Sequence, residues 1–151
     1  MKPGAGYFPM YTGTVWAVIL LAQLGATIDM DKRIATACAY ILDHSLTKCG
    51  NFTTKGSPSG TLECLQGNLY DSLLELGCTD QRLDKAYELM ARIVTGEGIA
   101  LMTDRNAPLR YYSGDLCGPG FACGGTYRKP CAWGAIKIML AFGKLPAEKK
   151  T

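Results

Sequence analysis

One short pattern occurs twice in this 151-residue chain, about 50 positions apart. In each copy a leucine-rich run ends in Leu-Gly, and an Asp-x-Arg triplet follows within a few residues. The first copy joins Leu24-Gly25 to Asp31-Lys32-Arg33, and the second joins Leu76-Gly77 to Asp80-Gln81-Arg82. A third run, Ile138 to Gly143, repeats only the first half. Such a period indicates stacked helical hairpins, in which each helix–turn–helix unit buries an apolar face against the next.

Glycine and aspartate mark the two ends of each predicted turn. A glycine follows each of the three apolar runs, at Gly25, Gly77 and Gly143. Helices commonly end on a residue that tolerates a left-handed conformation, so each glycine predicts a helix end. Asp31 (or Asp29) and Asp80 then stand where an N-cap side chain accepts the first free backbone N–H groups of the next helix.

Apolar periodicity predicts five helices, near 12–25, 31–46, 63–77, 80–95 and 131–143. The first helix of a unit is apolar around its whole girth: Val15 to Leu24 contains only Gln23 as a polar residue, and Ala132 to Phe142 only Lys137. We expect such helices to be buried on all sides and the second helices to be amphipathic. The predicted fold is therefore a single all-α domain, 1–151, with units at about 12–62, 63–130 and 131–151.

Composition limits the possible classes of protein. A chain that is 48% hydrophobic and 19% charged is typical of a soluble globular protein. The net charge of +3 comes without clustered basic residues, which argues against nucleic-acid binding. Val15 to Ala26 is shorter than the ~20 apolar residues of a membrane-spanning helix, so no transmembrane segment is expected. Seven cysteines with no recognisable export signal favour a reducing compartment, and we expect a cytoplasmic protein.

Cysteines gather where predicted inner helices begin. Cys117, Cys123 and Cys131 are separated by five and seven residues, with glycines between them, and Cys64 opens the equivalent helix one unit earlier. Thiolates are preferred ligands of structural zinc, so these four residues are a candidate zinc site. A helix N-terminus also lowers the pKa of a thiol, which favours either metal binding or nucleophilicity. Buried free thiols fit the same pattern, and the spacing leaves all three interpretations open.

The repeat resembles the α/α-toroid superfamily of terpenoid cyclases and protein prenyltransferases, known from squalene–hopene cyclases. The resemblance rests on the Leu-Gly-x-x-Asp-x-Arg turn at Leu76 to Arg82. The segments Glu63 to Leu69 and Lys129 to Lys137 are most similar to an uncharacterised prokaryotic branch of cyclase-like repeat proteins. The resemblance implies an α/α-toroid-like partial ring of about 2.5 hairpins. Because five helices do not close a ring, it also implies self-association or pairing with another toroid half.

The catalytic motifs of that superfamily are incomplete in this sequence. Class II cyclases protonate their substrates with Asp-x-Asp-Asp, to which Asp29-Met30-Asp31 is the nearest string. Prenyltransferases hold zinc with an Asp-x-Cys pair and a distant His. Asp115-Leu116-Cys117 is similar to that pair, which makes Asp115 and Cys117 the candidate catalytic residues, but His44, the one histidine, lies upstream.

Four aromatic residues are candidates for ligand binding. Trp16 and Trp133 occur early in inner helices, where a toroid would direct them into its cavity to hold an isoprenoid-like ligand, although ordinary core packing is the alternative. Tyr111 and Tyr112 lie in a long loop whose composition is typical of binding surfaces. Two functions follow: a non-catalytic binding or assembly module, which the missing motifs favour, or an enzyme or enzyme subunit acting on isoprenoid or terpenoid substrates.

Overall fold

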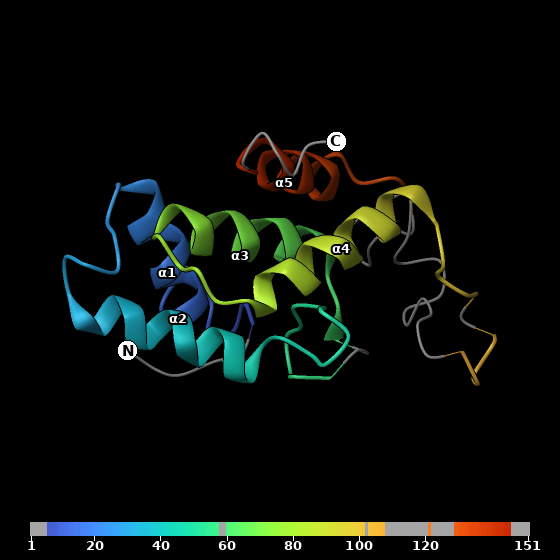
Figure 1. Ribbon diagram of the computed structural model, residues 1–151, viewed down its shortest axis with the longest axis horizontal. Helices are drawn as coiled ribbons and strands as arrows, with labels where there is room; N and C mark the ends of the chain where they lie inside the picture. Colours follow the sequence, from blue (N-terminus) through green and yellow to red (C-terminus); the bar gives the residue numbers. More distant parts are fainter. Residues whose placement is uncertain (1–5, 58–59, 102, 108–120, 122–128, 146–151) are drawn as a thin grey trace.

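The computed structural model describes residues 6–57, 60–101, 103–107, 121 and 129–145 (Figure 1). Its helices are α1 (Thr14–Gln23), α2 (Lys32–His44), α3 (Glu63–Glu75), α4 (Arg82–Thr95) and α5 (Ala132–Gly143). Short β contacts also occur, among them two isolated antiparallel bridges, Leu46 with Phe52 and Thr53 with Thr61. The predicted all-α class is confirmed. No described helix has the combined length and apolar character that crossing a bilayer requires.

α3 lies at the centre, in contact with both α1 and α5. α3 and α5 run in parallel, because Gly134 lies beside the first residue of α3 and Gly67 lies beside the backbone of Lys137. α1 and α3 end side by side, where the backbone N–H of Ile28 donates to the Leu76 carbonyl at 2.8 Å. α2 packs against α1 and α4 against α3, so the first helices form a row, α1–α3–α5, with α2 and α4 beside it (Figure 1).

The two Leu-Gly turns close in the same way. Gly25 and Gly77 adopt φ angles of +75° and +84°. Each glycine N–H donates to the carbonyl three residues back, at 3.0 and 2.9 Å respectively. The next N–H, of Ala26 or Cys78, donates to the carbonyl five residues back, at the same two distances. This pair of bonds satisfies the last carbonyls of a helix, and it needs a left-handed residue at the glycine.

The third predicted glycine end has the expected position but not the expected left-handed conformation. Gly143 is the last residue inside α5, and Lys144 follows it with a right-handed φ of −81°. The final carbonyls of α5 accept instead from the N–H groups of Lys144 and Leu145, each at 3.3 Å. Because the chain stays right-handed there, no left-handed glycine is required.

The two Asp-x-Arg triplets are also alike. Asp31 accepts a hydrogen bond from the backbone N–H of Arg33 at 2.8 Å, and Asp80 accepts one from that of Arg82 at 2.9 Å. Each guanidinium then folds back onto the same carboxylate. These hydrogen bonds hold the pKa of Asp31 at about 2 and lower that of Asp80. The N-cap of α2 is Asp31 rather than Asp29.

The expectation that inner helices are buried on all sides is wrong for α1 and α5. α5 leaves Trp133 59% exposed and Met139 69% exposed, and α1 leaves Leu20 55% exposed. The buried helix is α3, whose sequence is the most polar of the three, and which buries even Gln66 and Asn68. The reason is position, because α3 alone has another first helix on each side.

The buried amide of Gln66 attaches the loop after α2 to α3. Its Oε1 accepts from the Phe52 N–H at 2.7 Å, and its Nε2 donates to the carbonyls of Phe52 and Leu62. The Phe52 ring is fully buried in the core. The side chain of Gln66 therefore supplies the hydrogen-bond partners that the buried backbone N–H and C=O of Phe52 require.

Candidate functional site

A largely apolar groove of about 280 Å³ lies between α1 and α5, above α3. Its lining residues are Tyr11, Trp16, Ile19, Leu20, Gln23, Asn68, Trp133 and Lys137. The groove thus brings Trp16 of α1 and Trp133 of α5 to one place, although 116 positions separate them in the sequence. They are the two tryptophans of the chain, and both were ligand-binding candidates from the sequence.

The ring of Trp16 is held in place by its neighbours. The indole Nε1–H donates to the backbone carbonyl of Tyr7 at 2.8 Å. The rings of Tyr7 and Tyr11 lie against it, with centroids 5.0 and 4.8 Å away. Such contacts fix an aromatic side chain beyond what burial alone provides. Trp16 therefore presents a rigid wall of the groove.

A polar pair lies beneath this wall. Asn68 Nδ2 on α3 donates to the Tyr7 hydroxyl at 2.7 Å. Burial raises the pKa of Tyr7 well above its usual value, with a smaller contribution from the neighbouring Cys64 thiol. The phenol is therefore neutral at physiological pH, and it joins the N-terminal segment to the central helix. Cys64 faces this contact.

The opposite wall carries one positive charge. The Lys137 ammonium lies 4.9 Å from the centroid of the Trp133 ring, a cation–π contact. Beside it on α3, burial raises the pKa of Asp71, while the charges of Lys144 and Lys137 act against that rise. Lys137, Asn68 and Gln23 thus give the apolar groove a polar margin.

The lining determines the chemistry available to the groove. Its titratable groups among the described residues are the Tyr11 phenol and the Lys137 ammonium, and it contains no carboxylate, thiol or imidazole that could act with them as a base or nucleophile. Aromatic and aliphatic surface with a few polar groups at its edge is typical of sites that bind apolar molecules.

The four candidate zinc ligands are divided between described and undescribed parts of the chain. Cys117 and Cys123 lie outside the described residues. Cys64 is in the first turn of α3 and Cys131 is the N-cap of α5, so both stand at helix starts of parallel helices, as predicted. The described residues alone form no metal-binding group. The zinc site stays a prediction.

Other sequence candidates are placed as follows. Tyr111, Tyr112 and Asp115 lie outside the described residues, so their roles stay predictions. His44 is exposed at the end of α2, with its ring 4.3 Å from that of Tyr40. Asp31 and Asp80 act at helix starts, as described above.

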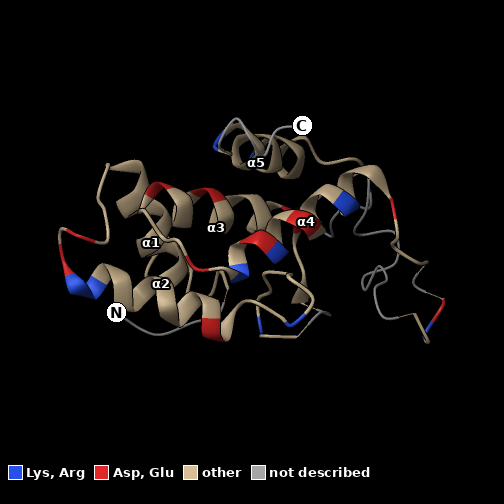
Figure 2. Ribbon diagram, in the orientation of Figure 1, with Lys and Arg blue, Asp and Glu red and all other residues tan. Residues whose placement is uncertain are grey.

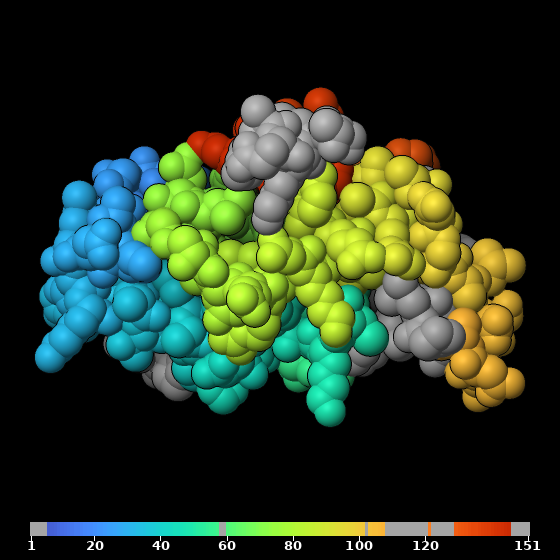
Figure 3. Space-filling view, viewed as in Figure 1, coloured from blue at the N-terminus to red at the C-terminus, as the bar shows by residue number. Residues whose placement is uncertain are grey.

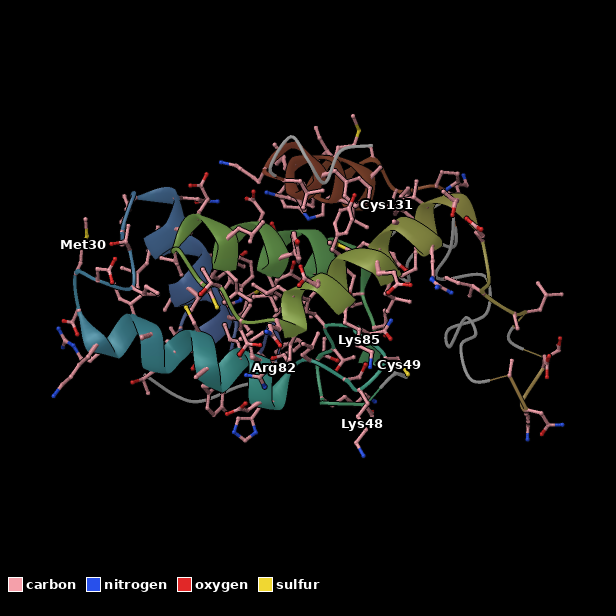
Figure 4. All side chains as sticks on the ribbon, viewed as in Figure 1. Met30, Lys48, Cys49, Arg82, Lys85 and Cys131 are labelled. Carbon is pink, nitrogen blue, oxygen red and sulfur yellow. The ribbon has the colours of Figure 1, made fainter. Side chains whose placement is uncertain are left out.

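A second hollow, of about 490 Å³, lies where α2 meets the start of α4, and no sequence pattern indicated it. There Arg82 Nη1 lies 2.7 Å from Asp43 Oδ1 and the guanidinium also pairs with Asp80. Lys48 and Lys85 line the same hollow (Figure 4). The two carboxylates more than offset the charge of Arg82, so the positive charge left in the hollow comes from two exposed lysines. The hollow is best described as a junction between hairpins.

Comparisons with protein-family models, with curated proteins and with solved structures found no match.

Proposed function

We propose that the chain is a non-catalytic binding module whose α1–α5 groove takes an apolar, isoprenoid-like ligand. The observation that carries the proposal is the meeting of Trp16 and Trp133 across one apolar groove. Two indole faces with aliphatic neighbours suit a branched, unsaturated hydrocarbon chain. Binding is favoured over catalysis because the described lining holds no carboxylate, thiol or imidazole to act together with the Tyr11 phenol or the Lys137 ammonium.

We place the chain among α/α-toroid-like repeats, as a partial ring of about 2.5 hairpins. The parallel row α1–α3–α5 and the matching turns after α1 and α3 support this placement. In a ring of hairpins the row of first helices faces the interior, and the groove is lined by residues from all three first helices.

The groove carries its own reporter, because both tryptophans of the chain line it. Titration with farnesol is expected to shift tryptophan emission to shorter wavelength and to saturate, since the ligand replaces water around the indoles. Emission that stays unchanged up to the solubility limit of farnesol would contradict the proposal.

Two leucines of α1 provide a matched pair of variants. Leu20 lines the groove and is 55% exposed, while Leu24 is 73% exposed and is not among the lining residues. Leu20→Gln is expected to weaken farnesol binding about tenfold, because an apolar contact worth about 1.5 kcal/mol is lost. Leu24→Gln is expected to leave affinity unchanged. Equal effects of the two variants would show that binding is not at the groove.

A further inference from the structure

An apolar stripe runs along the outer face of α5. It consists of Trp133, Ile136, Met139 and Leu140, which are 59%, 54%, 69% and 46% exposed. Lys137, the one polar residue of the helix, borders the stripe at one end: its backbone lies against α3 and its ammonium lies 4.9 Å from the centroid of the Trp133 ring. Figure 2 shows how nearly free of charge α5 is in comparison with α4.

No described residue covers the stripe. The opposite side of α5, formed by Gly134, Ile138 and Ala141, packs against α3. In the space-filling view α5 forms the upper edge of the described molecule (Figure 3). Monomeric soluble proteins rarely expose contiguous apolar patches of more than a few hundred Å². The α5 stripe therefore points to an interaction surface.

We propose that the α5 stripe is the interface of a homodimer in which two copies of α5 pack antiparallel. Trp133 lies three residues before Ile136 and Met139 three residues after it. A two-fold axis at Ile136 consequently sets Trp133 of one copy against Met139 of the other and Ile136 against itself. A two-fold interface must be self-complementary in this way, and a thioether against an aromatic ring is a favourable contact.

The size of the stripe agrees with a weak dimer. Four large side chains about half to two-thirds exposed present on the order of 500 Å², at ~200 Å² for each whole side chain. Two copies then bury about 1,000 Å² in total, near the lower limit for a specific interface. Association in the micromolar range is expected. The second copy is the favoured occupant because the stripe is self-complementary about Ile136 and its area is that of a weak dimer.

Sedimentation velocity between 1 and 200 μM tests this proposal. The wild type is expected to shift with concentration from the 16.3 kDa mass of one chain toward twice that mass. Met139→Glu is expected to remain a monomer, because it places a carboxylate in the interface. Met30→Glu is the matched control: Met30 is 70% exposed, in the turn before α2 and far from α5 (Figure 4), and this variant is expected to dimerise like the wild type.

Each alternative outcome is informative. A wild type that remains monomeric throughout, or identical behaviour of the two methionine variants, overturns the proposal. So does a monomer that co-sediments with phosphatidylcholine vesicles through α5, since the occupant is then a membrane surface. If Met139→Glu fails to fold by circular dichroism, a photo-crosslinking residue in place of Ile136 replaces it. The expected adduct joins position 136 to α5 of a second copy, and an adduct elsewhere rules the arrangement out.

Discussion

α3 and α5 are both first helices of a hairpin unit, yet the more polar helix, α3, is the more buried of the two, and the more apolar helix, α5, is the more exposed. α3 carries Glu63, Gln66 and Asn68 and is almost wholly buried. α5 has Lys137 as its one polar residue and exposes Trp133 and Met139. α3 has α1 and α5 as neighbours, whereas the described contacts of α5 are mainly with α3. In a stacked array the number of neighbouring helices determines how far a helix is buried. The apolar residues that α5 leaves exposed therefore indicate a surface that a ligand or a partner covers.

The largest effect is expected from a change at the close contact between α3 and α5. A Cβ at Gly67 would lie 2.2 Å from the backbone carbonyl carbon of Lys137, so Gly67→Ala must push α5 away from α3. We expect the free energy of unfolding, measured in urea, to fall by about 3 kcal/mol. Gly143→Ala is the control, because a Cβ there meets nothing within 4 Å. That change is expected to raise stability slightly through helix propensity, and a loss equal to that of Gly67→Ala would contradict the close-contact explanation.

The buried polar residues of α3 give the second prediction. Gln66→Leu keeps the volume but leaves the Phe52 N–H buried without its acceptor. Stability is expected to fall by about 2 kcal/mol. Gln23→Leu, on the exposed side of α1, is expected to change it by less than about 0.5 kcal/mol. If the two glutamine variants are equally stable, the burial of polar groups in α3 does not depend on this hydrogen bond.

The smallest expected effect concerns the turn that α1 and α3 share and that α5 lacks. The pKa of Asp31 is lowered from 3.8 to about 2 by its hydrogen bonds to Arg33. A carboxyl whose folded pKa is depressed stabilises the fold above its unfolded pKa, and this contribution is lost as pH falls from about 4 to about 2. Denaturation at several pH values is therefore expected to show a smaller decrease in that window for Asp31→Asn than for the wild type. If the stability of the two proteins depends on pH in the same way, the hydrogen bonds of Asp31 do not stabilise the fold.

Local signals were enough to predict the five helices from the sequence. Gly25 and Gly77 mark left-handed ends, and Asp31 and Asp80 accept the first N–H groups of the next helices. Gly143 misled because glycine permits a left-handed turn without requiring one. The signals that worked describe interactions within a few residues, which a sequence states directly.

Burial and the groove depend on tertiary contacts, and these were predicted less well. Periodicity indicates which residues favour burial, but it does not show whether a neighbouring helix exists to bury them. The hydrogen bond between Phe52 and Gln66 joins residues 14 positions apart in the sequence, and no sequence pattern predicted it. Trp16 and Trp133 were candidates by type and position, whereas their meeting in one groove follows from the parallel order of α1, α3 and α5.

The proposal that the groove between α1 and α5 binds an apolar ligand can be tested by a ¹H–¹⁵N correlation spectrum during a farnesol titration. Two tryptophans give two indole N–H signals, one from each wall of the groove. We expect both signals to shift and to reach saturation at the same farnesol concentration, because one ligand contacts both walls. Indole signals that stay in place while backbone signals elsewhere move would contradict it.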